Sequence, residues 1–276
     1  MENIKKFAVI GHPINHSKSP LIHRLFAQQY NIKLSYEKFD IEPRQFEIAI
    51  DDLRKQNYCG LNITLPFKNN AFLYCEKHSL KAKKTHSVNT LIFEKDITFG
   101  ESTDGIGLIK DFENCGVKLE SSNILLLGAG GAAQGVLFDL INKKPASISV
   151  NNRTIKKAED LLNNWQDEAK TNKVNLSIMD KKIDEYNFDV IINATSAGLL
   201  GDTLPISKEI FNSDTFYYDM TYGKNTAFLQ EAKNCGAKYS DGLGMLVCQA
   251  AESFRLWHDG KEPDSKSVIR ELKNFL

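Results

Sequence analysis

A glycine-rich turn between an apolar stretch and a helix-like stretch constrains the fold more than any other feature of the chain. The segment "SNILLLGAGGAAQGVLFDLIN" places Gly128-x-Gly130-x-x-Ala133 directly after an apolar run. In dinucleotide-binding folds the first glycine permits a tight turn, the second lets the backbone approach a pyrophosphate, and a small third residue lets the helix pack on the strand. The alternative is a glycine-rich turn that binds no ligand. Both interpretations predict a strand–turn–helix unit.

Strand-like and helix-like segments alternate on both sides of this turn. Segments with strand patterns cover residues 5–11, 34–40, 60–64, 147–150, 189–195 and 215–220, and a hairpin is expected within 88–102 around Lys95-Asp96. Segments with helical patterns cover residues 20–30, 43–56, 225–236, 242–260 and 264–276. This alternation predicts an α/β fold with mostly parallel sheets.

A length of 276 residues is sufficient for two domains of ordinary size. The alternation of strand-like and helix-like segments restarts near Thr103–Gly105. We expect an N-terminal, mostly parallel α/β domain over 1–103 and a Rossmann-type dinucleotide-binding domain over 104–241.

The composition excludes several classes of protein. The 35 basic and 35 acidic residues balance, whereas nucleic-acid and membrane-surface binders usually show a basic excess. The five scattered cysteines form no C-x-x-C, which indicates reduced thiols in a cytosol. The N-terminus has no apolar signal region, and "ILLLGAGGAA" is too short to span a bilayer. We therefore expect a cytoplasmic protein without nucleic-acid or membrane partners.

The end of the second strand after the glycine turn indicates which cofactor the fold would take. NAD-specific sites usually carry Asp or Glu there, which binds the ribose 2′-hydroxyl. The segment "NNRT" has no carboxylate, and Arg153 and Lys157 supply two cations near a helix start. Cations at a helix N-terminus oppose its dipole, so a bound 2′-phosphate would resolve the conflict. The sequence favours NADP(H) over NAD(H).

Polar residues of the first hundred positions cluster near predicted strand ends. Asn62 and Thr64 alternate, so they lie on one face of a strand, and Lys68 follows in the loop or first helical turn. Ligands of open α/β sheets bind beyond the carboxyl ends of strands. Lys68 alone could be an ordinary surface lysine, and Asp104 could be an N-cap. Asn89, in "SVNT", joins this polar set.

The segment "HPINHSKSPLIH" holds three histidines, two serines and two prolines. Its histidines fit no common zinc spacing and no cysteine is near, so we expect no metal site. Pro20 favours the first helical position, which makes Ser19 the expected N-cap. A helix N-terminus also binds anions, and the hydroxyls of Ser17 and Ser19 would add donors for a carboxylate.

These motifs together resemble the shikimate dehydrogenase family. The resemblance covers nearly the whole chain, in the order "HSKSP", "NITLPFK", "VNT", "TDGIG", "GAGGA", "NRT", "NATSAG", "YDMTY" and "DGLGMLVCQAA". It implies an oxidoreductase that reduces 3-dehydroshikimate to shikimate with NADPH, in the route to chorismate and the aromatic amino acids. It also implies that the domain over 1–103 is the substrate-binding and catalytic domain, and that the C-terminal helices, 242–276, pack back onto it.

The resemblance also implies roles for individual residues. Lys68 and Asp104 would be catalytic, with Lys68 as the acid/base, and Ser17 and Ser19 would hold the substrate carboxylate. The full substrate-binding set would be Ser17, Ser19, Asn62, Thr64, Lys68, Asn89, Asp104, Tyr222 and Gln249. The cofactor-binding set would be Gly128, Ala129, Gly130, Gly131, Ala132, Asn152, Arg153, Thr154, Lys157, Met220 and Gly242.

Two alternatives stay open at this point. One is a broader quinate/shikimate dehydrogenase that could use NAD(H). The other is a non-catalytic NADPH-binding regulator on the same fold, whose expected signature is loss of Lys68 or Asp104. In each case the partner is a small molecule, and the chain is expected to be a monomer or a homodimer.

Overall fold

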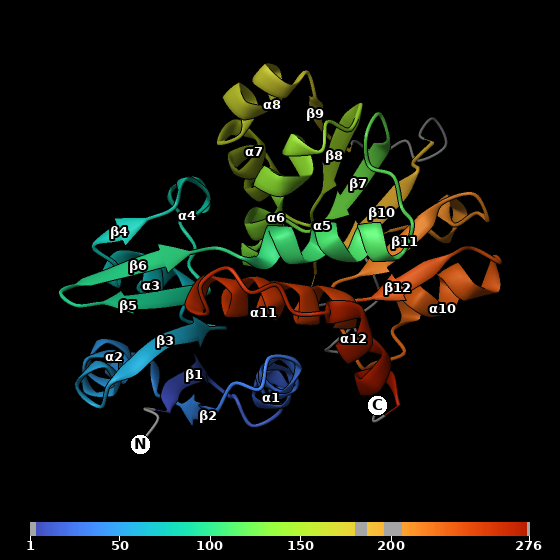
Figure 1. Cartoon of the computed structure of the whole chain (residues 1–276). Helices are drawn as coiled ribbons and strands as arrows, with labels where there is room; N and C mark the ends of the chain where they lie inside the picture. The colour runs from blue at the N-terminus through green and yellow to red at the C-terminus, as the bar shows by residue number, and fades with distance from the viewer. Residues whose placement is uncertain (1–3, 180–186, 196–205, 275–276) are drawn as a thin grey trace. The chain divides into compact units, whose positions relative to one another are not determined.

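The computed structural model describes residues 4–179, 187–195 and 206–274 (Figure 1). The chain divides into two compact units, residues 1–107 with 247–276, and residues 108–246. The C-terminal segment therefore belongs with the first unit, as the fold prediction expected. The junctions lie at 107/108 and 246/247, whereas the predicted domains meet at 103/104 and 241/242.

The first unit contains a mixed six-stranded sheet in the order β2-β1-β3-β5-β6-β4. Strand β1 pairs in parallel with β2 and β3, while β5 runs antiparallel to both β3 and β6. The β5–β6 hairpin confirms the turn predicted at Lys95-Asp96. The strands are β1 Lys5–Gly11, β2 Leu34–Asp40, β3 Tyr58–Ile63, β4 Lys77–His78, β5 Thr90–Glu94 and β6 Ile97–Glu101.

Helices cover both faces of this sheet. Alternate residues of β1 face opposite layers, so Ala8 and Ile10 join the core formed with α2 and α3, while Phe7 stacks on Trp257 of α11 with ring centroids 4.7 Å apart. The helices of this unit are α1 Ser19–Gln29, the 3-10 turn η1 Pro43–Gln45, α2 Phe46–Lys55, α3 Lys68–Tyr74, α4 Leu80–Thr85 and α12 Ser265–Lys273, together with most of α11 Leu243–Trp257.

The second unit contains a parallel six-stranded sheet in the order β12-β11-β10-β7-β8-β9. Counted from β7, this is the order 3-2-1-4-5-6 of dinucleotide-binding folds, which confirms the Rossmann-type prediction. The strands are β7 Asn123–Leu127, β8 Ser147–Asn151, β9 Asn175–Ile178, β10 Val190–Asn193, β11 Phe216–Asp219 and β12 Tyr239–Asp241.

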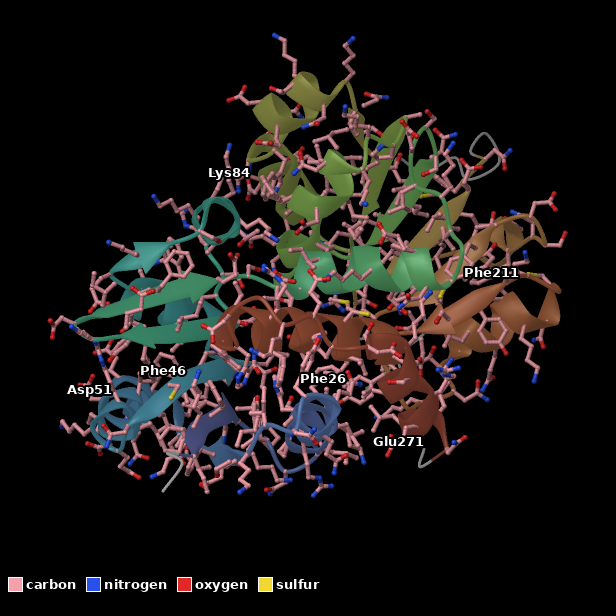
Figure 2. The ribbon with its side chains drawn as sticks, in the orientation of Figure 1. Phe26, Phe46, Asp51, Lys84, Phe211 and Glu271 are labelled. Atoms are coloured by element: carbon pink, nitrogen blue, oxygen red, sulfur yellow. The ribbon has the colours of Figure 1, made fainter. Side chains whose placement is uncertain are left out.

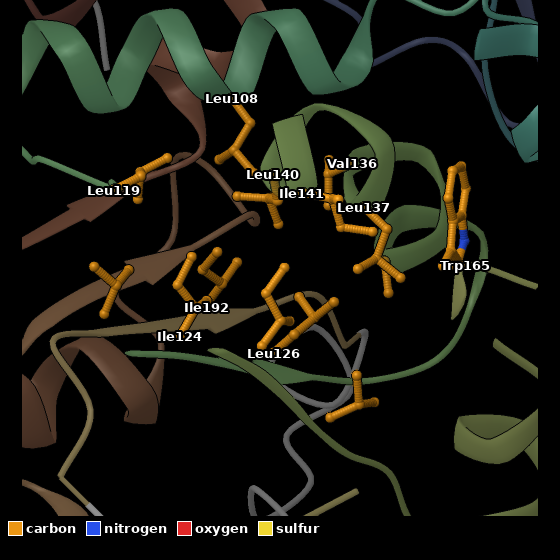
Figure 3. Close-up of a cluster of buried hydrophobic side chains, with 14 of the residues drawn as sticks. Leu108, Leu119, Ile124, Leu126, Val136, Leu137, Leu140, Ile141, Trp165 and Ile192 are labelled. Atoms are coloured by element: carbon orange, nitrogen blue, oxygen red, sulfur yellow. The ribbon is translucent and has the colours of Figure 1, made fainter. Parts of the chain in front are cut away.

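The apolar runs of these strands follow from burial on both sheet faces. In β7, Ile124 and Leu126 belong to one buried cluster, while Leu125 and Leu127 belong to another. Figure 3 shows the first cluster, where Ile124 and Leu126 lie below Leu140 and Ile141 of a covering helix. The helices of this unit are α5 Asp104–Asn114, α6 Gly131–Asn142, α7 Ile155–Asn163, α8 Gln166–Asn172, the 3-10 turn η3 Lys208–Ile210 and α10 Ala227–Asn234, with α5 starting in the first unit.

Within the described ranges, no helix combines the length and apolar character that a bilayer crossing requires.

Candidate active site

The polar residues predicted near the end of β3 lie at the end of that strand, in the turn that follows it and at the start of α3. Asn62 is the penultimate residue of β3 and is only 5% exposed. Thr64 follows the strand and anchors the next turn, because its carbonyl accepts from Phe67 N at 3.0 Å. Lys68 is the first residue of α3, as the prediction of a first helical turn allowed. Its ammonium donates to Asp104 Oδ2 at 2.6 Å.

Asp104 lies at the junction of the β6 end and α5. It is the first residue of α5, where a carboxylate is favoured by the helix dipole. Its carboxylate accepts from Lys68 Nζ and, at 2.9 Å, from Asn89 Nδ2. The N-cap interpretation of Asp104 is wrong, since the helix already begins at this residue and its carboxylate binds side chains instead of a backbone amide.

Asn89 links this pair to helix α11. Its Oδ1 accepts from the Thr103 backbone N at 2.8 Å, so its Nδ2 must point the other way, toward Asp104. The same Nδ2 donates to Gln249 Oε1 at 3.3 Å. Gln249 belongs to α11, so the helix after Gly242 brings a predicted substrate ligand to residues more than a hundred positions earlier.

The start of α1 differs from the prediction. The helix begins at Ser19, Lys18 occupies the capping position, and no side chain caps it. The expectation that Ser19 is the N-cap is therefore wrong. Ser17 Oγ accepts from Ser19 N at 3.3 Å and donates to Ser19 Oγ at 3.2 Å. Pro20 fits one position further into the helix, where its missing N–H is also tolerated.

The glycine turn has the backbone that the fingerprint predicts. Gly128 has φ +105°, a conformation that favours glycine, and an added Cβ would contact Thr195 and the Ala194 carbonyl. A Cβ at Gly130 or Gly131 would meet no atom of the described residues within 4 Å, so as far as these residues go the space in front of this backbone is open. Helix α6 begins at Gly131. The backbone amides of its first turn therefore lie at the helix N-terminus, the end that favours anions. The turn fits a pyrophosphate.

The residues after β8 are arranged as an exposed cationic corner. Asn152 Oδ1 accepts from Ala129 N at 3.2 Å and its Nδ2 donates to the Thr154 carbonyl at 2.8 Å, which ties the glycine turn to the β8 end. Arg153 and Lys157 are exposed, and among the described residues neither has an ion-pair partner. Lys156 differs from both, because it pairs with Asp160 at 3.0 Å.

Met220, Tyr222 and Gly242 lie near the ends of β11 and β12. An added Cβ at Gly242 would come within 2.2 Å of the Met220 carbonyl oxygen, so only glycine permits this close approach of the two loops. Asp219 holds the first loop by accepting from Thr221 N at 2.9 Å. Tyr222 is partly buried, and this burial raises the pKa of its phenol.

The predicted residues therefore fall into two groups, one in each unit. In the first unit, Asn62, Lys68, Asn89, Asp104 and Gln249 form a connected hydrogen-bonded set, whereas Ser17 and Ser19 bond each other at the start of α1 and Thr64 contributes its backbone to the turn after β3. The second unit carries the glycine turn, the cationic corner and the Met220 loop. The relation between the groups stays a prediction. Part of the "NATSAG" motif, residues 196–198, lies outside the described residues. Sequence reasoning missed four members of the first set, Tyr36, Thr90, Thr103 and Ser253, and only Thr90 and Thr103 lay in quoted motifs.

Across the described ranges, no group of three or more histidine, cysteine or acidic side chains could hold a metal ion. His12 instead pairs with Asp40, Nδ1 to Oδ1, at 2.6 Å, and this hydrogen bond raises the pKa of His12.

Comparisons with known proteins agree with this arrangement. Residues 9–91 match the shikimate dehydrogenase substrate-binding domain, residues 110–203 the shikimate/quinate 5-dehydrogenase family, and residues 242–273 the shikimate 5′-dehydrogenase C-terminal domain. Shikimate dehydrogenase (NADP(+)) of Hydrogenovibrio crunogenus is 42% identical, with 98% of each chain covered. The enzyme of the same name from Vesicomyosocius okutanii is 44% identical, covering 97% of this chain and 99% of its own.

Solved structures show the same fold. An Ael1 enzyme from Pseudomonas putida superposes with a TM-score of 0.89 at 39% identity, covering 97% of this chain and 98% of the other. Shikimate 5-dehydrogenase from Thermus thermophilus, in complex with NADP(H) and shikimate, has a TM-score of 0.87 at 30% identity, with coverages of 99% and 100%. On the strength of these matches along its whole length, the chain belongs to the shikimate dehydrogenase family.

Proposed function

We propose that this chain reduces 3-dehydroshikimate to shikimate with NADPH, reversibly, in the route to chorismate and the aromatic amino acids. The observation that carries the proposal is the Lys68–Asp104 ion pair, held by Asn89, in a chain of this family. A general acid next to a carboxylate is what ketone reduction needs, because the carbonyl oxygen must gain a proton as the carbon gains a hydride.

The chemistry divides between the cofactor and the protein. When NADPH is bound, the hydride comes from its nicotinamide. Lys68 donates a proton to the developing alkoxide, and in the reverse direction accepts it from the alcohol. Asp104 holds the ammonium in place through the 2.6 Å contact and can accept from a substrate hydroxyl with its remaining lone pairs. The side chains of Lys68 and Asp104 are 25% and 13% exposed, which leaves the pair accessible to a substrate.

The cofactor proposal rests on the second unit. The glycine turn offers open backbone at Gly130 and Gly131 for the pyrophosphate, and Arg153 and Lys157 offer cations for the 2′-phosphate. An Arg fork suits phosphate geometry, and neither cation has an acidic partner in the described structure that would have to be displaced. The relatives named as NADP(+) enzymes support the same choice. Met220 and Gly242 would flank the nicotinamide.

The substrate proposal rests on the first unit. Ser17 and Ser19 would bind the carboxylate at the start of α1, where the first-turn amides add donors. Asn62, Thr64, Asn89 and Gln249 would bind the ring hydroxyls or the reacting oxygen, and Tyr222 of the other unit would touch the substrate.

The substrate is a small molecule, and we propose that the protein is a monomer or homodimer in the cytoplasm. Five free cysteines fit a reducing compartment.

The two alternatives make different predictions from this structure. A non-catalytic regulator would be expected to lack Lys68 or Asp104, and both are present and paired. A broader enzyme that uses NAD(H) has a parallel among the structural neighbours, since the Listeria monocytogenes enzyme was solved with shikimate and NAD at 25% identity. The cationic corner at Arg153 favours NADP(H) for this chain.

One assay tests the proposal. Purified protein is incubated with shikimate and either NADP⁺ or NAD⁺, and the reduced-nicotinamide absorbance is followed, with quinate as a second substrate. We expect rapid reduction of NADP⁺ with shikimate, and much slower reaction with NAD⁺ or quinate. No reaction with shikimate and either cofactor would refute the proposal, and equal use of both cofactors would refute its cofactor choice.

A further inference from the structure

The side-chain amide of Asn62 is held from both ends by residues far apart in the chain. Its Oδ1 accepts from the hydroxyl of Tyr36, on β2, at 2.7 Å. Its Nδ2 donates to Ser253 Oγ, on α11, at 2.9 Å, and also lies 3.2 Å from the Asn89 carbonyl and from Thr90 Oγ1. A backbone carbonyl can only accept, so the orientation of the amide is unambiguous.

This arrangement uses both amide protons of Asn62. One proton goes to Ser253 Oγ, and the other is shared between Asn89 O and Thr90 Oγ1. The Oδ1 atom has two lone pairs, of which the Tyr36 hydroxyl takes one. Toward a ligand, Asn62 can therefore offer an acceptor and no donor.

Tyr36 is well placed to impose this orientation. Its ring stacks on that of His23 with centroids 4.3 Å apart and planes 10° from parallel. His23 is fully buried and packs edge-on against Phe26, which Figure 2 labels on α1. Burial raises the pKa of Tyr36 well above its ordinary value, so the hydroxyl stays protonated and remains a donor.

Ser253 connects Asn62 to the Lys68–Asp104 pair through further hydrogen bonds. It is fully buried, and its Oγ lies 2.8 Å from Thr90 Oγ1. Thr90 Oγ1 in turn donates to Asn89 Oδ1 at 3.1 Å, and Asn89 Nδ2 donates to Asp104. A continuous set of hydrogen bonds thus runs from Tyr36 through Asn62 and Ser253 to the carboxylate that holds Lys68.

We propose that Tyr36 and Ser253 are positioning residues that fix the Asn62 amide, so that Asn62 presents only an acceptor and selects a substrate carrying a free hydroxyl at the position it contacts. The inference rests on the proposed function and deepens it, because it names what one substrate ligand can recognise. A keto or methoxy group at that position brings no donor, and would face the Asn62 oxygen without a hydrogen bond.

The test uses the full-length protein and compares shikimate with 4-deoxy- and 5-deoxyshikimate. We expect the kcat/KM of wild type to be lower for both analogues than for shikimate, and lowest for the analogue that lacks the hydroxyl bound by Asn62. Tyr36→Phe and Ser253→Ala should each raise the KM for shikimate about 3- to 10-fold, the worth of one hydrogen bond, with a smaller change in kcat. Both variants should also discriminate less between shikimate and that analogue. Discrimination equal to wild type in both variants would overturn the inference.

A second measurement separates positioning from general stability. In an Asn62→Ala background, Ser253→Ala should raise KM much less than it does in wild type, because the part of its effect that passes through Asn62 is already lost. An equal effect in both backgrounds would show that Ser253 acts elsewhere and would overturn the inference. Ser149→Ala is the matched control, since its buried hydroxyl bonds Ser177 Oγ at 3.0 Å in the other unit, and it should leave discrimination unchanged.

The wild-type assay separates the two levels of the account. If wild type forms no NADPH from shikimate, the proposed function fails and this inference fails with it. If wild type is active and the Tyr36 and Ser253 variants keep normal KM and discrimination, only the inference fails.

Discussion

Lys68 Nζ lies 2.6 Å from Asp104 Oδ2, an ion pair that joins the first residue of α3 to the first residue of α5. The two residues are 36 positions apart in the sequence. They meet because β3 and β6 lie two places apart in one sheet, with β5 between them, and the helices start just beyond these strands. The contact gives a proton donor a fixed position and leaves both side chains partly exposed.

Replacing Lys68 with alanine should lower kcat for shikimate oxidation by about 10²- to 10⁴-fold, the usual contribution of a positioned general acid–base group. KM should change far less. Lys55→Ala is the control, because Lys55 forms an exposed ion pair with Asp52 on α2. Steady-state kinetics of the two variants decide the matter, and a near-normal kcat with a raised KM would reduce Lys68 to a binding residue.

Arg153→Ala should raise the KM for NADP⁺ and leave the use of NAD⁺ almost unchanged, because the 2′-phosphate alone is lost as a partner. A loss of about 1.5–3 kcal/mol is expected for a charge-assisted contact, roughly 10- to 150-fold in KM. Lys156→Ala serves as control, since Lys156 is already paired with Asp160. Equal losses with both cofactors would mean that Arg153 supports the fold and does not read the phosphate.

Ser17→Ala should raise the KM for shikimate strongly. It should change the KM for the neutral carboxamide analogue of shikimate little. The reason is that the Ser17 hydroxyl is expected to donate to the carboxylate at the start of α1. The melting temperature should fall only slightly, because the bond that Ser17 Oγ accepts from Ser19 N is long, at 3.3 Å. A variant that distinguishes acid from amide as well as wild type does would show that Ser17 is not a carboxylate ligand.

His23 should make the protein less stable in mild acid. Burial lowers the pKa of His23 to about 3, whereas an unfolded histidine titrates near 6.5. The contribution of neutral His23 to the free energy of unfolding is complete above about pH 6.5. It is lost as the pH falls toward 3, because the unfolded chain binds the proton at a higher pH than the folded protein does. The expected slope is about 1.4 kcal/mol per pH unit.

Two measurements check the behaviour of His23. Urea unfolding of His23→Asn between pH 7 and pH 5 should show a shallower loss of stability than wild type. NMR of wild type should find the His23 imidazole neutral throughout that range. Protonation of the native ring near pH 6 would contradict the burial argument. His258, whose pKa burial lowers to about 4, remains in both proteins.

The periodic segments were predictable from sequence because their signals are local. The β5–β6 hairpin, the Gly128 turn and the end of α10 before Gly236, where φ is +77°, each depend on a few adjacent residues. Strands β9 and β12 were missed, since each has three or four residues at a sheet edge and forms only because a neighbour pairs with it. Helix α4 was also missed, because its six residues are too few to show a helical repeat of apolar positions.

The start of α1 shows where a local rule fails by one residue. Pro20 favours the first helical position and so predicted Ser19 as the cap, but Lys18 already has helical dihedrals, φ −92° and ψ −3°, and the helix begins a residue earlier. Tyr36 and Ser253 show a different limit. Their contacts to Asn62 span 26 and 191 positions, so no window of the sequence contains the signal.

A double-mutant cycle on Lys68 and Asp104 tests the central claim most directly. NADPH formation from shikimate is measured for wild type, Lys68→Ala, Asp104→Asn and the double variant under identical conditions. We predict an active wild type, a loss of kcat of about 10²- to 10⁴-fold in each single variant, and a double variant hardly slower than the slower single one, because the pair acts as a unit. An inactive wild type, or a double loss equal to the product of the single losses, would contradict the account.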